Sequence, residues 1–181
     1  MSTTTPAASG GSTAPIIATP ATIRLERPDD ADWIEPLHDI CFGPGRYART
    51  AFRVRERIEP DPSLAYCAEM DGVPIASVKM TPIAINGVKG HLLGPLATDP
   101  VYRNKGAGKA LVKHVTAEAM ARGSAFVMLI GDPPYYSPLG FAPTVRGLVR
   151  FPGPVDPDRI LVHCPAELIA SLDGEVGPWR D

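Results

Sequence analysis

The order of predicted elements indicates a mixed α/β or α+β fold built on a largely antiparallel sheet. Asp71-Gly72 and Asn86-Gly87 are two-residue hairpin turns, and each of them joins two extended stretches. A segment with helical periodicity follows over residues 106–122, and a continuous apolar run of strand length comes after it. This last pattern is typical of a crossover helix that leads into a buried strand.

Residues 22–60 predict one strand and two helices. Ile23-Arg24-Leu25 alternates like a strand. The first helix has carboxylates at its start and apolar residues at helical spacing: Asp29 and Asp30, then Trp33, Ile34, Leu37 and Ile40. The second helix is expected over residues 47–58 and ends before Pro60. Its arginines form either a substrate-facing basic patch or a solvated face; they are Arg49, Arg53, Arg55 and Arg57.

The sheet continues through the middle of the chain. Three extended stretches cover residues 64–70, 74–85 and 89–98. The helix over 106–122 places apolar residues on one face, namely Ala107, Leu111, Val115 and Ala119. A buried strand is expected over 125–131, and Asp132-Pro133 then opens a short helix that ends at Gly140-Phe141. Further strands are predicted near residues 145–151 and 160–163.

Composition limits the class of protein. Residues 1–21 contain almost no anchoring side chains, which predicts a disordered tail and leaves residues 22–181 as a single domain. The formal net charge of −2 gives no basic face for nucleic acid or for an acidic membrane surface. The sequence has no apolar run of about 18 residues and no secretion signal, so we expect a cytoplasmic protein.

The three cysteines predict free thiols and no metal site. Cys41, Cys67 and Cys164 are far apart in the sequence, and no CxxC or Cys/His cluster accompanies them. Free thiols of this kind are typical of a reducing compartment.

A basic, glycine-rich loop leads from the strand that ends at Thr98 into the helix at 106–122. The first turn of a helix has N–H groups without internal partners and a partial positive charge. Gly106 and Gly108 remove side chains that would keep a ligand from those amides. Because Arg103, Lys105 and Lys109 add full charges, the segment predicts an anion site suited to a pyrophosphate.

Two common nucleotide loops do not fit this segment. A Walker loop requires glycine where Arg103 stands and serine or threonine where Ala110 stands. A dinucleotide fingerprint requires a third glycine in place of Leu111, and a parallel strand before the loop.

The segment instead resembles the cofactor motif of the GNAT superfamily of N-acetyltransferases, which is Arg/Gln-x-x-Gly-x-Gly/Ala. Residues Arg103 to Gly108 match this motif, and the Asp-Pro-x-Tyr-Arg sequence that often precedes it in the family is present as Asp99 to Arg103. A second motif, Tyr135 to Phe141, is similar to the aromatic-Tyr-x-x-x-Gly-Phe ending of that family. The resemblance covers about residues 22–151 and points to a poorly characterised bacterial branch. It implies a sheet that splays between its fourth and fifth strands, with helices on both faces.

The resemblance also implies a function. The chain would move an acetyl group from acetyl-CoA directly to a primary amine of a small molecule or peptide, with no metal. Backbone amides of the loop would hold the pyrophosphate, and the end of the preceding strand would pair with pantetheine. The cofactor-binding residues would be Leu96, Ala97, Thr98, Arg103, Asn104, Lys105, Gly106, Ala107, Gly108 and Lys109.

Tyr136 is the proton donor that the resemblance implies. A phenol stays protonated at neutral pH and can protonate a departing thiolate. The alternative is that Tyr136 packs on the sheet with its hydroxyl bonded structurally, and Tyr135 is expected to be its packing partner. Asp99 and Asp132 are candidate bases, although both stand where helix caps are expected.

Several questions stay open at the level of sequence. His91 and Glu69 could relay a proton through water. The arginines of the second helix are hints of an acidic or carboxylate-bearing acceptor. A homodimer is possible. A non-catalytic acyl-CoA sensor, or a subunit that binds a partner, is the alternative to an enzyme.

Overall fold

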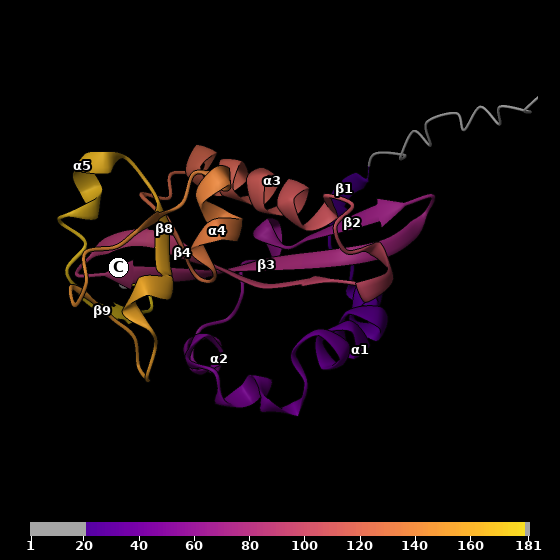
Figure 1. Ribbon diagram of the computed structural model, residues 1–181, viewed down its shortest axis with the longest axis horizontal. Helices are drawn as coiled ribbons and strands as arrows, with labels where there is room; N and C mark the ends of the chain where they lie inside the picture. Colours follow the sequence, from indigo (N-terminus) through magenta and orange to yellow (C-terminus); the bar gives the residue numbers. More distant parts are fainter. Residues whose placement is uncertain (1–20, 180–181) are drawn as a thin grey trace, which may run out of the picture.

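The computed structural model of the chain describes residues 21–179, in which one sheet is flanked by helices on both faces. The strands are β1 (Thr22–Leu25), β2 (Tyr66–Met70), β3 (Val73–Ile85), β4 (Val88–Thr98), β5 (Val127–Ile130), β6 (Ala142–Pro143), β7 (Val149–Arg150), β8 (Ile160–His163) and β9 (Gly174–Gly177). The helices are α1 (Ala31–Phe42), α2 (Thr50–Arg55), α3 (Ala107–Ala121), α4 (Pro133–Tyr136) and α5 (Ala166–Ile169). Figure 1 shows α3 and α4 on one side of the sheet and α1 and α2 on the other.

The sheet is mixed and mostly antiparallel, as the sequence predicts. Its strands run in the order β1-β2-β3-β4-β5-β8-β6, and β9 pairs with the far end of β3 and with β7. Only β4–β5 and β7–β9 are parallel among the pairs formed within residues 21–179. The predicted tail, residues 1–21, lies outside the described residues except for Ala21, which packs against the core.

Both predicted hairpin turns are confirmed. Asp71 and Gly72 have φ values of 52° and 77°, and Asn86 and Gly87 have 47° and 82°. Two consecutive positive φ values are the conformation that a two-residue turn needs to follow the twist of its strands. These turns set the register in which Met70 faces Val73 across the first hairpin.

The apolar face predicted for α3 packs on the sheet. Leu111, Val115 and Ala119 are completely buried against β3 and β4, and Ala107 is nearly so. A second core lies toward the C-terminal strands, where Phe126, Met128 and Val162 gather. Within the described part of the chain, no helix is both long and apolar enough to cross a membrane.

Two predicted elements are wrong in extent. The helix expected over residues 47–58 is a 3-10 segment, Pro44–Ala48, followed by the short α2, because Arg49 between them has extended backbone angles. The strand expected over residues 145–151 is reduced to β7, because the chain turns at Gly147, whose φ is 86°. The sequence patterns also gave no sign of α5 and β9.

The segment that leads into α1 is held to the sheet by a buried carboxylate. Asp30 forms an ion pair of 2.6 Å with Arg24 on β1 and accepts a 2.8 Å hydrogen bond from the Trp33 indole. Arg24 also pairs with Glu69 on β2 at 2.5 Å. The guanidinium of Arg24 holds the pKa of Asp30 well below its usual range, so the carboxylate stays charged.

Replacing Asp30 by Ala should lower the free energy of unfolding by about 3 kcal/mol, because the half-buried Arg24 keeps its charge and loses one partner. Denaturant titration followed by circular dichroism would measure this. Asp29→Ala is the matched control, since Asp29 is exposed. Equal stability of the two variants would contradict the assignment.

Candidate active site

The sheet opens between β4 and β5. The two strands pair in parallel only at His91–Val127 and Leu92–Met128, and β4 then continues to Thr98 without β5 beside it. An irregularity accompanies the opening, because Val78 of β3 faces Leu96 while Met80 faces Leu93. The extra residue on β4 is the signature of a β-bulge, which bends a strand and redirects the residues after it. The predicted splay between the fourth and fifth strands is therefore present.

Two cavities lie beside this opening. The first, which we call the α3 cavity, has a volume of about 490 Å³. It is lined by every predicted cofactor-binding residue except Lys105, and also by Cys41, Phe42, Asp132, Tyr135 and Tyr136. Lys105 instead places its ammonium 5.0 Å from the centre of the Tyr102 ring.

The start of α3 offers bare backbone donors to the α3 cavity. Gly106, in the left-handed conformation, is the N-cap and makes no side-chain cap, and the first hydrogen bond into the helix is donated by Ala110 to the Gly106 carbonyl at 2.9 Å. Asn104 also has a positive φ, of 62°. Alternating left-handed residues before a helix form a concave set of N–H groups that binds anions.

The end of β4 forms one wall of the same cavity. Leu96, Ala97 and Thr98 pair with β3 along one edge only. The Cys41 thiol at the end of α1 donates to the Thr98 carbonyl at 3.4 Å, and Arg103 lies 3.7 Å from the same sulfur. These contacts connect α1, the strand end and the loop.

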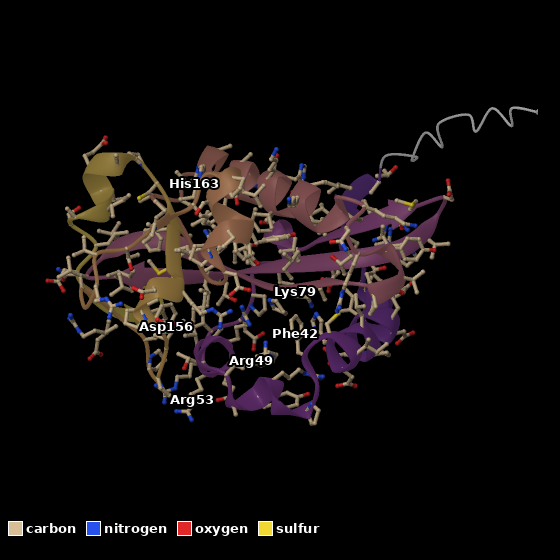
Figure 2. The ribbon with its side chains drawn as sticks, viewed as in Figure 1. Phe42, Arg49, Arg53, Lys79, Asp156 and His163 are labelled. Carbon is tan, nitrogen blue, oxygen red and sulfur yellow. The ribbon has the colours of Figure 1, made fainter. Side chains whose placement is uncertain are left out.

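The second cavity, which we call the α2 cavity, has a volume of about 540 Å³ and lies beside α2. Its lining comes from α2 with the end of α1, from the bulged part of β4 and from the segment 154–159 before β8. Leu129 and Ile130 of β5 and Tyr136 complete it. Phe42 and Arg49 lie next to each other on the side of α2 that faces α1 in Figure 2, and the Arg49 guanidinium is 5.6 Å from the centre of the Phe42 ring. Asp156 lines the cavity from the third segment.

Tyr136 borders both cavities, as do Phe42 and Leu96. Its ring packs against Tyr135 at a centroid distance of 4.8 Å and against Phe141 at 6.0 Å. Burial raises the pKa of Tyr136 to about 12, so the phenol keeps its proton well above neutral pH. Tyr135 is the packing partner that the sequence predicts.

The two candidate aspartates differ in their contacts. Asp99 accepts a 2.9 Å hydrogen bond from the Val101 amide and so caps a 3-10 turn, as predicted. The Asp132 side chain makes no cap and lies 3.1 Å from the Arg159 guanidinium at the rim of the α3 cavity. Its expected capping role is therefore wrong.

The other candidates lie away from both cavities. Glu69 is paired with Arg24, and His91 is buried with its Nδ1 2.6 Å from the Ser124 hydroxyl. Burial lowers the pKa of His91, which favours its neutral form. Burial also raises the pKa of the Cys67 thiol to about 12. Within residues 21–179, no group of three or more metal-binding side chains is present.

Sequence reasoning missed part of the site. Cys41 and Phe42 come from the end of α1, and their approach to residues 96–98 is a tertiary contact between distant segments. Asp156 lies after Pro152, where the resemblance ends. The aromatic residue immediately before Gly43-Pro44-Gly45 was the available signal for Phe42, because it stands where a helix end turns toward the sheet.

The fold and site define an α/β protein with an uncapped helix start beside a splayed sheet. The model of the Acetyltransferase (GNAT) family matches residues 31–141, and the chain belongs to this family. A curated relative, the uncharacterized N-acetyltransferase YhbS of Escherichia coli (strain K12), is 30% identical over 158 residues, which cover 86% of this chain and 92% of the relative.

Solved structures agree with this assignment. The crystal structure of Escherichia coli YhbS in complex with CoA superposes with a TM-score of 0.69 at 29% identity, and the match covers 87% of this chain and 89% of that one. A GNAT family acetyltransferase from Brucella melitensis in complex with acetyl-CoA has a TM-score of 0.55 at 26% identity, over 81% of this chain and 97% of that one.

The ionisation of Tyr136 can be measured directly. We expect its ring resonance in a protein with ¹³C-labelled tyrosine to titrate near pH 12, because burial disfavours the phenolate. The Tyr136→Phe variant would assign the signal, and a tyrosine peptide gives the reference of about 10. A midpoint at or below that reference would contradict the buried position.

Proposed function

We propose that residues 22–181 form one N-acetyltransferase domain, which moves an acetyl group from acetyl-CoA to a primary amine of a small molecule or peptide. The observation that carries this proposal is that two cavities meet at Tyr136, and that one of them contains the uncapped start of α3. The complexes of the relatives with CoA and acetyl-CoA support it.

Acetyl-CoA would occupy the α3 cavity. The amides from Asn104 to Lys109 would bind the pyrophosphate, and Arg103 and Lys109 would add charge beside them. Pantetheine would lie along Leu96 to Thr98, on the β4 edge from which β5 has separated. An extended chain placed there can exchange hydrogen bonds with the strand backbone as a neighbouring strand would.

The acceptor would enter through the α2 cavity and meet the thioester near Tyr136. The neutral amine nitrogen attacks the thioester carbonyl carbon, the carbon–sulfur bond breaks, and the proton that the nitrogen loses returns through water to the Tyr136 oxygen. The coenzyme thiolate takes the Tyr136 proton, which is available because burial keeps the phenol neutral. Holding the two reactants in adjoining cavities supplies part of the acceleration through proximity.

Binding of CoA tests the first part of this proposal. Gly106→Trp should weaken the affinity at least about tenfold, because the indole occupies the space that the pyrophosphate needs. Isothermal titration calorimetry would measure the dissociation constant.

Gly123→Trp is the matched control for this measurement. Gly106 and Gly123 stand at opposite ends of α3 with φ values of 89° and 93°, and neither has an atom within 4 Å of an added Cβ. The backbone strain that tryptophan introduces is therefore similar in the two variants, whereas only Gly106 borders the α3 cavity. Equal CoA affinity of both variants, or no saturable binding by the wild type, would overturn the proposal.

Tyr136→Phe should lower kcat about 100-fold while the CoA dissociation constant changes less than about twofold, because only the proton donor is removed. Release of free thiol across a panel of amines would report turnover. Tyr66→Phe is the control, since Tyr66 is a buried tyrosine outside both cavities. Unchanged turnover would exclude Tyr136 as the donor, and CoA binding without thiol release from any amine would favour the acyl-CoA sensor.

A further inference from the structure

The α2 cavity contains a half-buried arginine whose Nε is buried without a hydrogen-bond partner in the described part of the chain. This residue, Arg55, lies near the end of α2 and lines the cavity. Burial alone lowers its pKa, to about 10, and no carboxylate opposes that effect. The guanidinium therefore remains charged at neutral pH.

An unpaired guanidinium in such a place is costly. Buried charges in folded proteins are normally paired and hydrogen-bonded, because desolvation otherwise outweighs what packing returns. Its aromatic neighbour Phe52, 5.6 Å from the guanidinium, provides a ring face and no counter-charge. The cost is compensated if a ligand supplies the anion.

The fold makes room for this arginine against the bulge of β4. A Cβ on Gly94 would lie 2.7 Å from the Arg55 Nη2, so a side chain at that position would displace the guanidinium. Gly94 also has a φ of 119°, which disfavours other residues. The backbone at Gly94 and the Arg55 head together form the cavity wall next to Leu96.

The charges around the α2 cavity match a monoanion. Its charged lining consists of Arg49, Arg55, Arg159 and Asp156. Asp132 at 3.1 Å neutralises Arg159, which leaves two positive charges and one negative charge. A carboxylate supplies the one remaining negative charge, and its two oxygens fit the planar fork of a guanidinium.

We propose that the acceptor is an amino-acid-like molecule, whose carboxylate binds Arg55 in the α2 cavity while its amine faces Tyr136. This inference rests on the proposed function, because it assigns the acceptor of the same reaction. A cavity of about 540 Å³ has the size of a small-molecule site. Its apolar lining, from Phe42, Leu93 and Leu129, would contact the rest of the acceptor.

Matched acceptors test the inference. Each of a set of apolar L-amino acids would be compared with its carboxamide, its decarboxylated amine and its aminophosphonate analogue, with thiol release as the readout. We expect kcat/KM to be at least about 30-fold higher for the amino acid than for the carboxamide. Preference for the carboxamide, the plain amine or the phosphonate would overturn the inference.

Arg55→Gln should raise KM for the amino acid about 30-fold and leave kcat/KM for the plain amine within about threefold. Arg53→Gln is the control on the same helix, because Arg53 does not line the α2 cavity and lies at its outer side in Figure 2. An equal loss for both acceptors would indicate a merely structural role and refute the assignment. Thermal unfolding checks that the variant is folded.

A second variant and a binding measurement separate the two proposals. Arg49→Gln, at an exposed residue, should raise KM for the carboxylate acceptor alone by about threefold.

Calorimetry with N-acetyl amino acids in the presence of CoA measures binding at the carboxylate site without requiring turnover. Saturable binding of the N-acetyl amino acid that is lost with the N-acetyl carboxamide would support the carboxylate site. If no amine releases thiol in the activity assay, that result would refute only the proposed transferase activity. Equal binding of the N-acetyl amino acid and the N-acetyl carboxamide, or no binding of either, would refute the carboxylate site.

Discussion

The separation of β4 from β5 is the constraint on which the site depends, because both cavities lie beside it. The two strands share a short parallel ladder at residues 91–92 and 127–128, after which the bulge at Gly94–Pro95 turns β4 away. A strand edge that has lost its neighbour retains donors and acceptors, and these must find another partner. The same separation leaves space on both sides of Tyr136. One structural event thus creates a surface for an extended ligand, two cavities and the place where they meet.

The two cavities are both electropositive, but for different reasons. In the α3 cavity the charge comes from the backbone at the start of a helix, with Arg103 and Lys109 beside it. In the α2 cavity it comes from the side chains of Arg49 and Arg55. Phe42 and Leu96, which border both, separate these charges with apolar surface. In our proposal, the pyrophosphate of one reactant and the carboxylate of the other would bind in separate cavities, with the thioester and the amine facing each other between them.

Glycines provide the clearance that this arrangement needs. A Cβ on Gly131 would lie 2.3 Å from the Tyr136 ring, and one on Gly108 would lie 3.0 Å from the Tyr135 hydroxyl. Gly94 makes the corresponding space for Arg55. These glycines let the backbone approach the side chains of Tyr135, Tyr136 and Arg55 closely.

Elements with local signals could be predicted from the amino-acid order. Two-residue turns set the hairpins, and the spacing of apolar residues set α3. The glycines and basic residues at 103–109 indicated the uncapped start of α3 that we propose as an anion site. Each of these signals lies within one turn or one helix. Packing of the folded chain determined where α2 begins, since Arg49 adopts extended angles next to Phe42. It also determined that Cys41, Phe42 and Asp156 border the cavities and that the Nε of Arg55 is buried without a hydrogen-bond partner among the described residues. Contacts between distant segments depend on how the layers pack, and no local pattern in one sequence records that packing.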